Sequence, residues 1–491
     1  MMGKVTAMLQ AYKKKYKELA LPVKASMWFV ICSVIQNGIS FFVTPIFTRL
    51  MSTQQYGQVT VYTSWMGIIC IFTTFNLQYG SFNTAQVKFE GRRDQYIASI
   101  QSLVTVTTLI AIGIYLLIPS FWNQLFRLPN GITVIMLIHI LAQFVTGIWM
   151  GNKRFDFKYV PMIIVTTLSS FLIPLVGFIA VTNASEKGIA RIISMACVEI
   201  VIAGVLYIHN LYKGKVLAKK EFWKYALSFN LPLIPYYLSQ IIFNTSDRIM
   251  ISKMVGDDKA GIYGLCYSVA FLLTFIINAV NNAFVPWLYR QIKKNDGTDV
   301  GSVVRKLIIG VAVMLILLIL VAPELILFLG GKKYYEAIWI IPPVAASLLF
   351  SFYTDITCNI DFYYEEKKAL VVATIVSALT NIGLNYIGIP VFGYYVSGYT
   401  TLISFILFWI MLYIGARRVC REHDMDEKQY IDFGFQLRFG IGFLIVASLI
   451  MITYMNPYIR YGLIFVLLLL TVIFRKKLMG FVKSLMSFKG E

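Results

Sequence analysis

The chain has 491 residues, a net charge of +20, 58% hydrophobic residues and 14% charged residues. A soluble chain carries roughly 25% charged residues, so the composition excludes a soluble protein. The Lys and Arg residues lie in short clusters between apolar runs and form no separate basic domain, which argues against nucleic-acid binding. Only lipid can solvate this much apolar surface, so we predict an all-α polytopic membrane protein.

About fourteen segments are long and apolar enough for a helix to cross a bilayer, which takes about 20 residues. The first follows a basic amphipathic arm and is too long for the apolar region of a signal peptide. The uncharged run from Ala369 to Ala416 accommodates two helices, with Pro390 and Gly393 at the turn. The predicted spans are residues 25–47, 58–78, 97–120, 130–150, 160–181, 190–209, 226–251, 262–288, 304–322, 338–360, 369–389, 394–415, 436–455 and 458–474.

The charges of the connecting loops alternate from one loop to the next. With these fourteen spans, about three quarters of the 44 Lys and Arg residues lie on one side of the membrane. Cytoplasmic loops carry the excess of positive charge. The alternation therefore predicts that both termini are cytoplasmic.

A weak internal repeat relates the two halves of the chain. The segment 50–57 resembles the segment 254–261 after a shift of 204 residues, and each lies in an outer loop. Paired repeats build two lobes around a midplane site in many transporters. We predict two six-helix lobes plus two C-terminal helices. The predicted parts are a cytoplasmic amphipathic N-terminus (1–24), an N-lobe (25–212), a cytoplasmic linker (213–225), a C-lobe (226–416), a cytoplasmic loop (417–435), two further spans (436–475) and a basic cytoplasmic tail (476–491).

Polar side chains recur at helical spacing inside several spans. In the first span, Gln36, Ser40, Thr44 and Thr48 step by four and share one helical face. A water-filled cavity and hydrogen bonding between helices both explain such stripes. The candidates for a substrate cavity are Lys24, Gln36, Asn37, Arg49, Gln240, Asn244, Asp247, Arg248, Asn278, Asn381 and Asn385.

Four ionisable groups inside the spans are candidates for proton or ion coupling: Glu199, His139, Asp247 and Asp355. An unpaired carboxylate at mid-bilayer must be protonated or find a partner. Lys24 and Arg49 lie at the two ends of the first span, where reaching the lipid headgroups is the alternative to binding substrate. Coupling to H⁺, coupling to Na⁺ and passive facilitation all stay open.

No motif of a soluble enzyme occurs in the chain. There is no ATP-binding P-loop, no HExxH and no nucleophile elbow. The three histidines are scattered and the six cysteines lack metal-site spacing, so we expect no metal and no cofactor. A membrane-embedded glycosyltransferase or O-antigen ligase would need a large outer loop, and the outer loops are short. We therefore expect a transporter rather than an enzyme.

Several short motifs resemble one family of flippases. The sequence reads Leu231-Pro-Leu-Ile-Pro235, then Ser246-Asp-Arg-Ile-Met250, then Gly261-Ile-Tyr-Gly264. This combination resembles the signature of Wzx-type flippases for polysaccharide repeat units. Further matches are Pro45 with Thr48-Arg-Leu-Met-Ser52, Pro323-Glu-Leu-Ile with Tyr335-Glu-Ala337, and Asn381-Ile-Gly-Leu-Asn385. The resemblance covers the first twelve spans.

The resemblance implies a two-lobed bundle with alternating access, as in multidrug-and-toxin exporters and lipid II flippases. The implied substrate is an undecaprenyl-pyrophosphate-linked oligosaccharide, which crosses the bacterial cytoplasmic membrane for O-antigen, capsule or exopolysaccharide synthesis. Glycosyltransferases and a polymerase are the expected partners beside the bilayer. Arg49, Arg248 and Lys24 suit a pyrophosphate, and Tyr236, Tyr237 and Trp65 suit either sugar stacking or an aromatic belt. A cation-coupled multidrug exporter and a lipid II flippase are the alternatives.

Overall fold

The computed structural model describes residues 20–294, 297, 300–366 and 368–473. Throughout this part of the chain, every regular element is a helix. The prediction of an all-α membrane protein is confirmed. The N-terminal arm and the C-terminal tail, both predicted to be cytoplasmic, lie largely outside the described residues. The chain divides into two compact units, and each is considered by itself.

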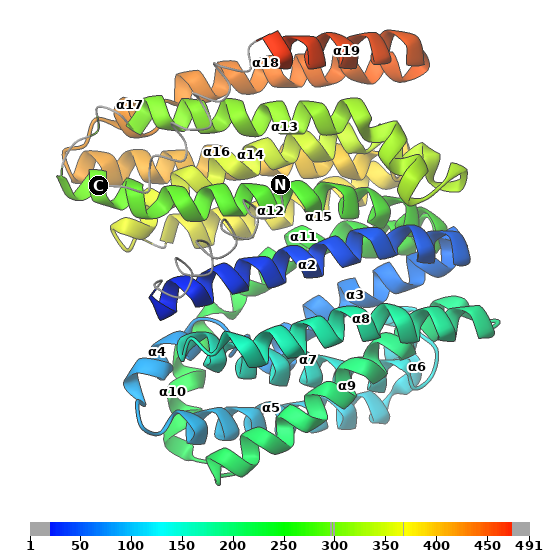
Figure 1. Cartoon of the computed structure of the whole chain (residues 1–491), viewed down its shortest axis with the longest axis vertical. Coiled ribbons are helices and arrows are strands. Elements are labelled where there is room, and N and C mark those ends of the chain that lie inside the picture. Colours follow the sequence, from blue (N-terminus) through cyan, green and yellow to red (C-terminus); the bar gives the residue numbers. More distant parts are fainter. Residues whose placement is uncertain (1–19, 295–296, 298–299, 367, 474–491) are drawn as a thin grey trace, which may run out of the picture. The chain divides into compact units, whose positions relative to one another are not determined.

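The first unit contains the described residues up to Met51 together with Tyr62–Leu238. Helix α8 packs against α2 and α9, and α9 also packs against α5 and α7 (Figure 1). Its helices are α2 (Leu21–Leu50), α3 (Thr53–Thr74, from Tyr62 onward), α4 (Ser81–Lys88), α5 (Arg93–Leu117), α6 (Pro119–Phe126), α7 (Ile132–Phe155), α8 (Tyr159–Asn183), α9 (Lys187–Gly214), α10 (Lys220–Asn230), η1 (Leu231–Leu233) and the start of α11 (Ile234–Met254).

The second unit contains Ser52–Val61 and the described residues from Ser239 onward. Helix α16 packs against both α14 and α15, and α13 packs against α14 and α18. Besides most of α11, its elements are α12 (Asp257–Lys294), α13 (Val300–Leu329), η2 (Lys332–Trp339), α14 (Ile341–Tyr363), α15 (Lys368–Phe392), α16 (Val396–Glu422), α17 (Glu427–Tyr430), α18 (Phe433–Ile452), η3 (Thr453–Met455) and α19 (Pro457–Ile473).

The predicted number of fourteen spans is not confirmed. Among the described residues, 11 helices are long and apolar enough to cross a membrane, or up to 12 if η2 and α14, bent by 50°, form one span. Helices also cover the other two predicted segments. Helix α3 is not among the 11 because its first turns carry three glutamines. Helix α19 has 17 residues within the described part of the chain and is not among the 11 either.

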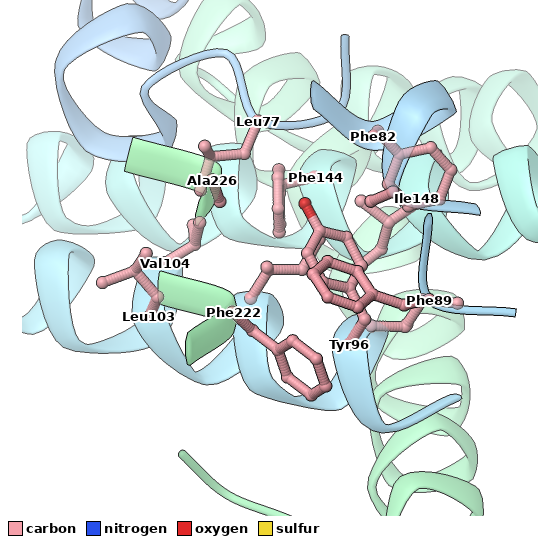
Figure 2. Close-up of a cluster of buried hydrophobic side chains, with 13 residues drawn as sticks. Leu77, Phe82, Phe89, Tyr96, Leu103, Val104, Phe144, Ile148, Phe222 and Ala226 are labelled. Atoms are coloured by element: carbon pink, nitrogen blue, oxygen red, sulfur yellow. The ribbon is translucent and has the colours of Figure 1, made fainter. Parts of the chain in front are cut away.

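A cluster of buried side chains joins α10 to the rest of the first unit (Figure 2). Phe222 and Ala226 of α10 are fully buried there. The ring of Phe89 stacks on Tyr96 at 5.4 Å between centroids and meets Phe222 edge-on at 4.9 Å. Aromatic pairs of this geometry add about 0.5–1.5 kcal/mol beyond the buried area. The end of the predicted linker, residues 213–225, is therefore a helix built into the first unit.

The two segments of the predicted repeat meet inside the second unit. A Cβ atom added to Gly57 would lie 1.7 Å from the carbonyl oxygen of Asp257, and one added to Gly261 would lie 2.3 Å from that of Thr53. Asp257 and Gly261 follow Thr53 and Gly57 by the same 204 residues. The contact is therefore reciprocal, as across a two-fold axis, and it follows the register of the sequence repeat.

Candidate functional site

A buried carboxylate, Asp247, is the centre of a hydrogen-bond network in the second unit. Its side chain is 1% exposed. The Thr401 hydroxyl and the Tyr263 hydroxyl each donate to Oδ2 at 2.7 Å, and Asn385 Nδ2 donates to Oδ1 at 2.6 Å. The Tyr267 hydroxyl donates to Oδ2 at 3.4 Å. Helices α11, α12, α15 and α16 thus contribute to one site, and every donor in it is neutral.

The predicted site residues Asn381 and Asn385 belong to this same network. Both amides are fully buried. Asn385 Oδ1 accepts from the Thr400 hydroxyl at 2.7 Å, and Asn381 Oδ1 accepts from Asn385 Nδ2 at 3.2 Å and from Ser246 Oγ at 3.3 Å. In this conformation the two amides bind other helices. Their assignment to a substrate cavity stays a prediction.

Arg248 follows Asp247 on α11 and packs on a tyrosine of the same network. Its guanidinium lies over the ring of Tyr267, with 4.5 Å from Cζ to the ring centroid. Its Nε atom is buried without a hydrogen-bond partner. A cation over an aromatic face gains about 0.5–2 kcal/mol, and the buried N–H remains available to an acceptor.

The polar stripe of α2 is satisfied largely within the helix itself. Asn37 Nδ2 donates to the Ser33 carbonyl at 2.8 Å, and the Thr44 hydroxyl donates to the Ser40 carbonyl at 2.9 Å. Gln36 is exposed. At the end of the helix Arg49, also exposed, donates to the Pro45 carbonyl at 3.0 Å, and Lys24 is half-buried near its start.

The remaining predicted cavity residues are more dispersed. Gln240 Nε2 donates weakly to Thr374 at 3.5 Å, and Asn244 bonds to the Gln240 carbonyl of its own helix at 2.7 Å. Asn278 is exposed on α12. Asp355, predicted as a coupling residue and not as a cavity residue, is half-buried on α14.

Two of the predicted coupling residues, His139 and Glu199, are directly paired in the first unit. His139 Nε2 lies 2.8 Å from Glu199 Oε2, although the residues are 60 positions apart. The other ring nitrogen, Nδ1, lies 2.9 Å from the hydroxyl of Tyr62. Sequence reasoning identified the two ionisable groups separately and missed Tyr62, which carries no charge to mark it.

Sequence reasoning also missed the partners of the Tyr335-Glu-Ala337 motif. Glu336 accepts from Lys259 Nζ at 2.5 Å and from the Tyr395 hydroxyl at 2.7 Å. Burial and the hydrogen bond to Glu336 raise the pKa of Tyr395, so the phenol stays protonated and acts as the donor. The motif glutamate therefore ties η2 to α12 and to the turn before α16.

Asn230, the residue before the Leu231-Pro-Leu-Ile-Pro235 motif, also joins separate elements of the fold through side-chain hydrogen bonds, as Glu336 does. Asn230 is fully buried. Its side chain donates to the carbonyls of Phe75 and Asn76 at 3.1 and 2.9 Å and accepts from the Ser81 backbone at 3.2 Å. Phe75 and Asn76 have positive φ values. Asn230 thereby fixes the strained turn between α3 and α4.

Comparisons with known proteins agree on both sequence and fold. Residues 23–293 match the family described as "Polysaccharide biosynthesis protein", and residues 232–387 match the family MatE. A relative in Haemophilus influenzae, "Lsg locus putative protein 1", is 22% identical over 72% of this chain and 88% of its own length. A second Haemophilus influenzae relative, described as an uncharacterized membrane protein, is 21% identical over 74% and 89%.

Two of the solved structures that share the fold are MOP superfamily transporters. One is an inward-facing multidrug resistance MATE family transporter of the MOP superfamily, with a TM-score of 0.62 and 13% identity over 81% of this chain and 98% of that one. The other is a MOP superfamily transporter from Pyrococcus furiosus, with a TM-score of 0.53 and 14% identity over 81% and 96%.

A helical bundle with this many long apolar helices defines a multi-pass membrane protein, and its fold is shared with a MATE family transporter. The chain belongs to the polysaccharide biosynthesis protein family, whose match covers more than half of its length.

Proposed function

We propose that this protein is a flippase of the Wzx type. It moves polyprenyl-pyrophosphate-linked oligosaccharide repeat units from the cytoplasmic to the outer leaflet of the bacterial cytoplasmic membrane. It works by alternating access, with both termini in the cytoplasm. The oligosaccharides then enter O-antigen, capsule or exopolysaccharide, through a polymerase that acts after the glycosyltransferases.

The observation that carries this proposal is the placement of charge. The most buried carboxylate of the candidate site, Asp247, is 1% exposed and enclosed by neutral donors, so in this conformation it is not accessible to a cationic drug. Helix α2 has no acidic residue, and it carries Lys24 and Arg49 at its ends with amides and hydroxyls between them. Basic and neutral polar groups suit an anionic, polyhydroxylated substrate.

Arg248 is the residue that we assign to the pyrophosphate. Its Nε atom is buried without a hydrogen-bond partner, while its guanidinium makes a cation–π contact with the Tyr267 ring. A guanidinium binds a phosphate through charge-assisted and bidentate hydrogen bonds. Tyr236 and Tyr237, whose rings are 5.6 Å apart, offer aromatic faces for sugar rings.

A cation-coupled multidrug exporter is the second candidate. It is favoured by the MatE match over residues 232–387 and by the fold of the MATE transporters. Such an exporter would require an acidic group open to its substrate. A lipid II flippase, the third candidate, would share the lipid pyrophosphate chemistry and differ in the attached sugars.

The proposal is tested by deleting the gene and measuring surface polysaccharide and lipid-linked intermediates. We expect surface polysaccharide to disappear and repeat units linked to the polyprenyl carrier to accumulate inside the cell. The wild-type gene restores display, and a variant of the exposed Arg418, Arg418→Ala, serves as a control. Normal surface polysaccharide in a deletion strain without a paralogue contradicts the flippase assignment, and increased sensitivity to cationic drugs alone favours the exporter.

A further inference from the structure

Tyr62, His139 and Glu199 form a hydrogen-bonded chain across three helices of the first unit. They come from α3, α7 and α9, and the two hydrogen bonds are 2.9 and 2.8 Å long. Tyr62 and His139 are buried, whereas the Glu199 side chain is 26% exposed. This hydrogen-bonded chain is therefore buried at the Tyr62 phenol and accessible at the Glu199 carboxylate.

The hydrogen-bonded chain can take up one proton and keep both of its hydrogen bonds, Tyr62–His139 and His139–Glu199. With a neutral imidazole, the Tyr62 hydroxyl donates to Nδ1 and Nε2–H donates to the Glu199 carboxylate. An added proton on Nδ1 makes an imidazolium, which donates to the Tyr62 oxygen and keeps its bond to Glu199. The net charge of the three groups changes from −1 to 0. Histidine is the side chain best suited to such a change near neutral pH.

The charged groups of the surrounding helices lie towards the helix ends. Helix α8 and the unit-1 part of α3 contain no Asp, Glu, Lys or Arg. On α9, Arg191 precedes Glu199 by about 12 Å of helix rise and His209 follows it by about 15 Å. Arg191 donates to the Ile173 carbonyl at 2.9 Å and lies over Phe47. The other charges lie near helix ends: Lys24, Arg49, Arg93, Asp94, Lys153 and Arg154, with Lys187 and Lys213 on α9.

The ligand set favours a proton over a metal cation. Hard cations such as Na⁺ require several oxygen ligands. Here the central group is an imidazole with both nitrogens already engaged, and Glu199 supplies the one carboxylate. Among the described residues, no group of three or more His, Cys, Asp or Glu side chains could hold a metal ion.

Tyr62 lies on α3, a helix whose residues are divided between the two units. It is the first residue of α3 that belongs to the first unit, since Ser52–Val61 of the same helix belongs to the second. Protonation of His139 reverses the direction of its hydrogen bond with the Tyr62 hydroxyl. The change is thus made on a helix that continues directly into the other unit.

We propose that Tyr62, His139 and Glu199 are the proton-binding site through which a proton gradient drives transport by this protein. The inference rests on the proposed flippase function, whose coupling ion it specifies. His139 holds the added proton on Nδ1, the Glu199 carboxylate stabilises the resulting imidazolium through Nε2–H, and Tyr62, whose hydrogen bond reverses, transmits the change to α3. Asp247, enclosed by neutral donors, has no part in this step.

The test uses the full-length protein in liposomes and a fluorescent disaccharide on a short-chain polyprenyl pyrophosphate as the probe. Wild type is compared with His139→Gln, Glu199→Gln and Tyr62→Phe. His209→Gln, on the same helix as Glu199, is the matched control. For one proton per substrate, we expect a gradient of one pH unit to change the accumulation ratio about tenfold in wild type and in the control, since one unit is a tenfold ratio of proton activity. We expect His139→Gln and Glu199→Gln to exchange probe but to lose this response.

A second readout separates proton binding from a structural role. Infrared difference spectra between mildly alkaline and mildly acidic pH should show a histidine signal that His139→Gln removes and His209→Gln retains. Glu199→Asp should restore part of the gradient response at equal thermal stability. Failure of wild type to move the probe under any gradient contradicts the flippase function. Transport that ignores the gradient, or a full gradient response in His139→Gln, contradicts the proton site alone.

Discussion

Gly57 and Gly261 pack backbone against backbone in the second unit, at equivalent positions of the sequence repeat. The amide nitrogen of Gly261 would be 3.1 Å from a Cβ atom on Gly57, and that of Gly57 would be 2.8 Å from one on Gly261. A little further along, a Cβ atom on Gly264 would meet the side chain of Thr60, 204 residues earlier, at 2.6 Å. Small residues allow helix backbones to approach this closely in membranes.

Replacing Gly261 with Ala should destabilise the protein by about 1–3 kcal/mol, the usual cost of overpacking. The added methyl group would lie 2.3 Å from the Thr53 carbonyl oxygen. This oxygen belongs to the backbone, so it cannot rotate away as the end of a side chain could. Gly204→Ala is the control, because nothing lies within 4 Å of a Cβ atom at that helical position. Thermal unfolding in detergent measures both variants. Equal melting temperatures for the two would contradict the close contact.

Replacing Asp247 with Asn should destabilise the second unit by about 1–3 kcal/mol, the cost of leaving a buried donor unsatisfied. Asparagine replaces one carboxylate oxygen, which is an acceptor, with an NH₂ donor. That donor would face either the hydroxyl donors now bonded to Oδ2 or the amide donor now bonded to Oδ1. Asp424→Asn, in an exposed turn, is the control. The measurement is thermal stability together with the level of folded protein. A wild-type melting temperature for Asp247→Asn would mean that the network contributes little.

Replacing Arg248 separates charge from geometry at the proposed pyrophosphate site. Arg248→Ala should impair export, whereas Arg248→Lys should retain more activity because it keeps the charge and loses only the bidentate geometry. Surface polysaccharide is measured at equal expression, with Arg418→Ala as the control for removal of an exposed arginine. If both substitutions at Arg248 export as wild type does, the guanidinium serves only the contact with Tyr267.

Much of the candidate site could be anticipated from the sequence because charge inside an apolar helix is conspicuous. Glu199, His139 and Asp247 stand out in this way, and the motif residues Asn381 and Asn385 recur at helical spacing. Their partners could not be anticipated. Tyr62, Tyr263 and Thr401 are ordinary residues of apolar helices, and the positions that pair in space are as much as 154 residues apart.

The sequence by itself determined that this is a helical membrane protein, which motifs it shares with a family, and the offset at which its halves correspond. Those features follow from local composition and periodicity, which no long-range contact alters. Only the tertiary structure decided that His139 meets Glu199, that Asp247 is enclosed, and that α3 is divided between two units. In lipid, apolar patterning does not tell one helix face from another, so these pairings are fixed by side-chain packing and hydrogen bonds between helices.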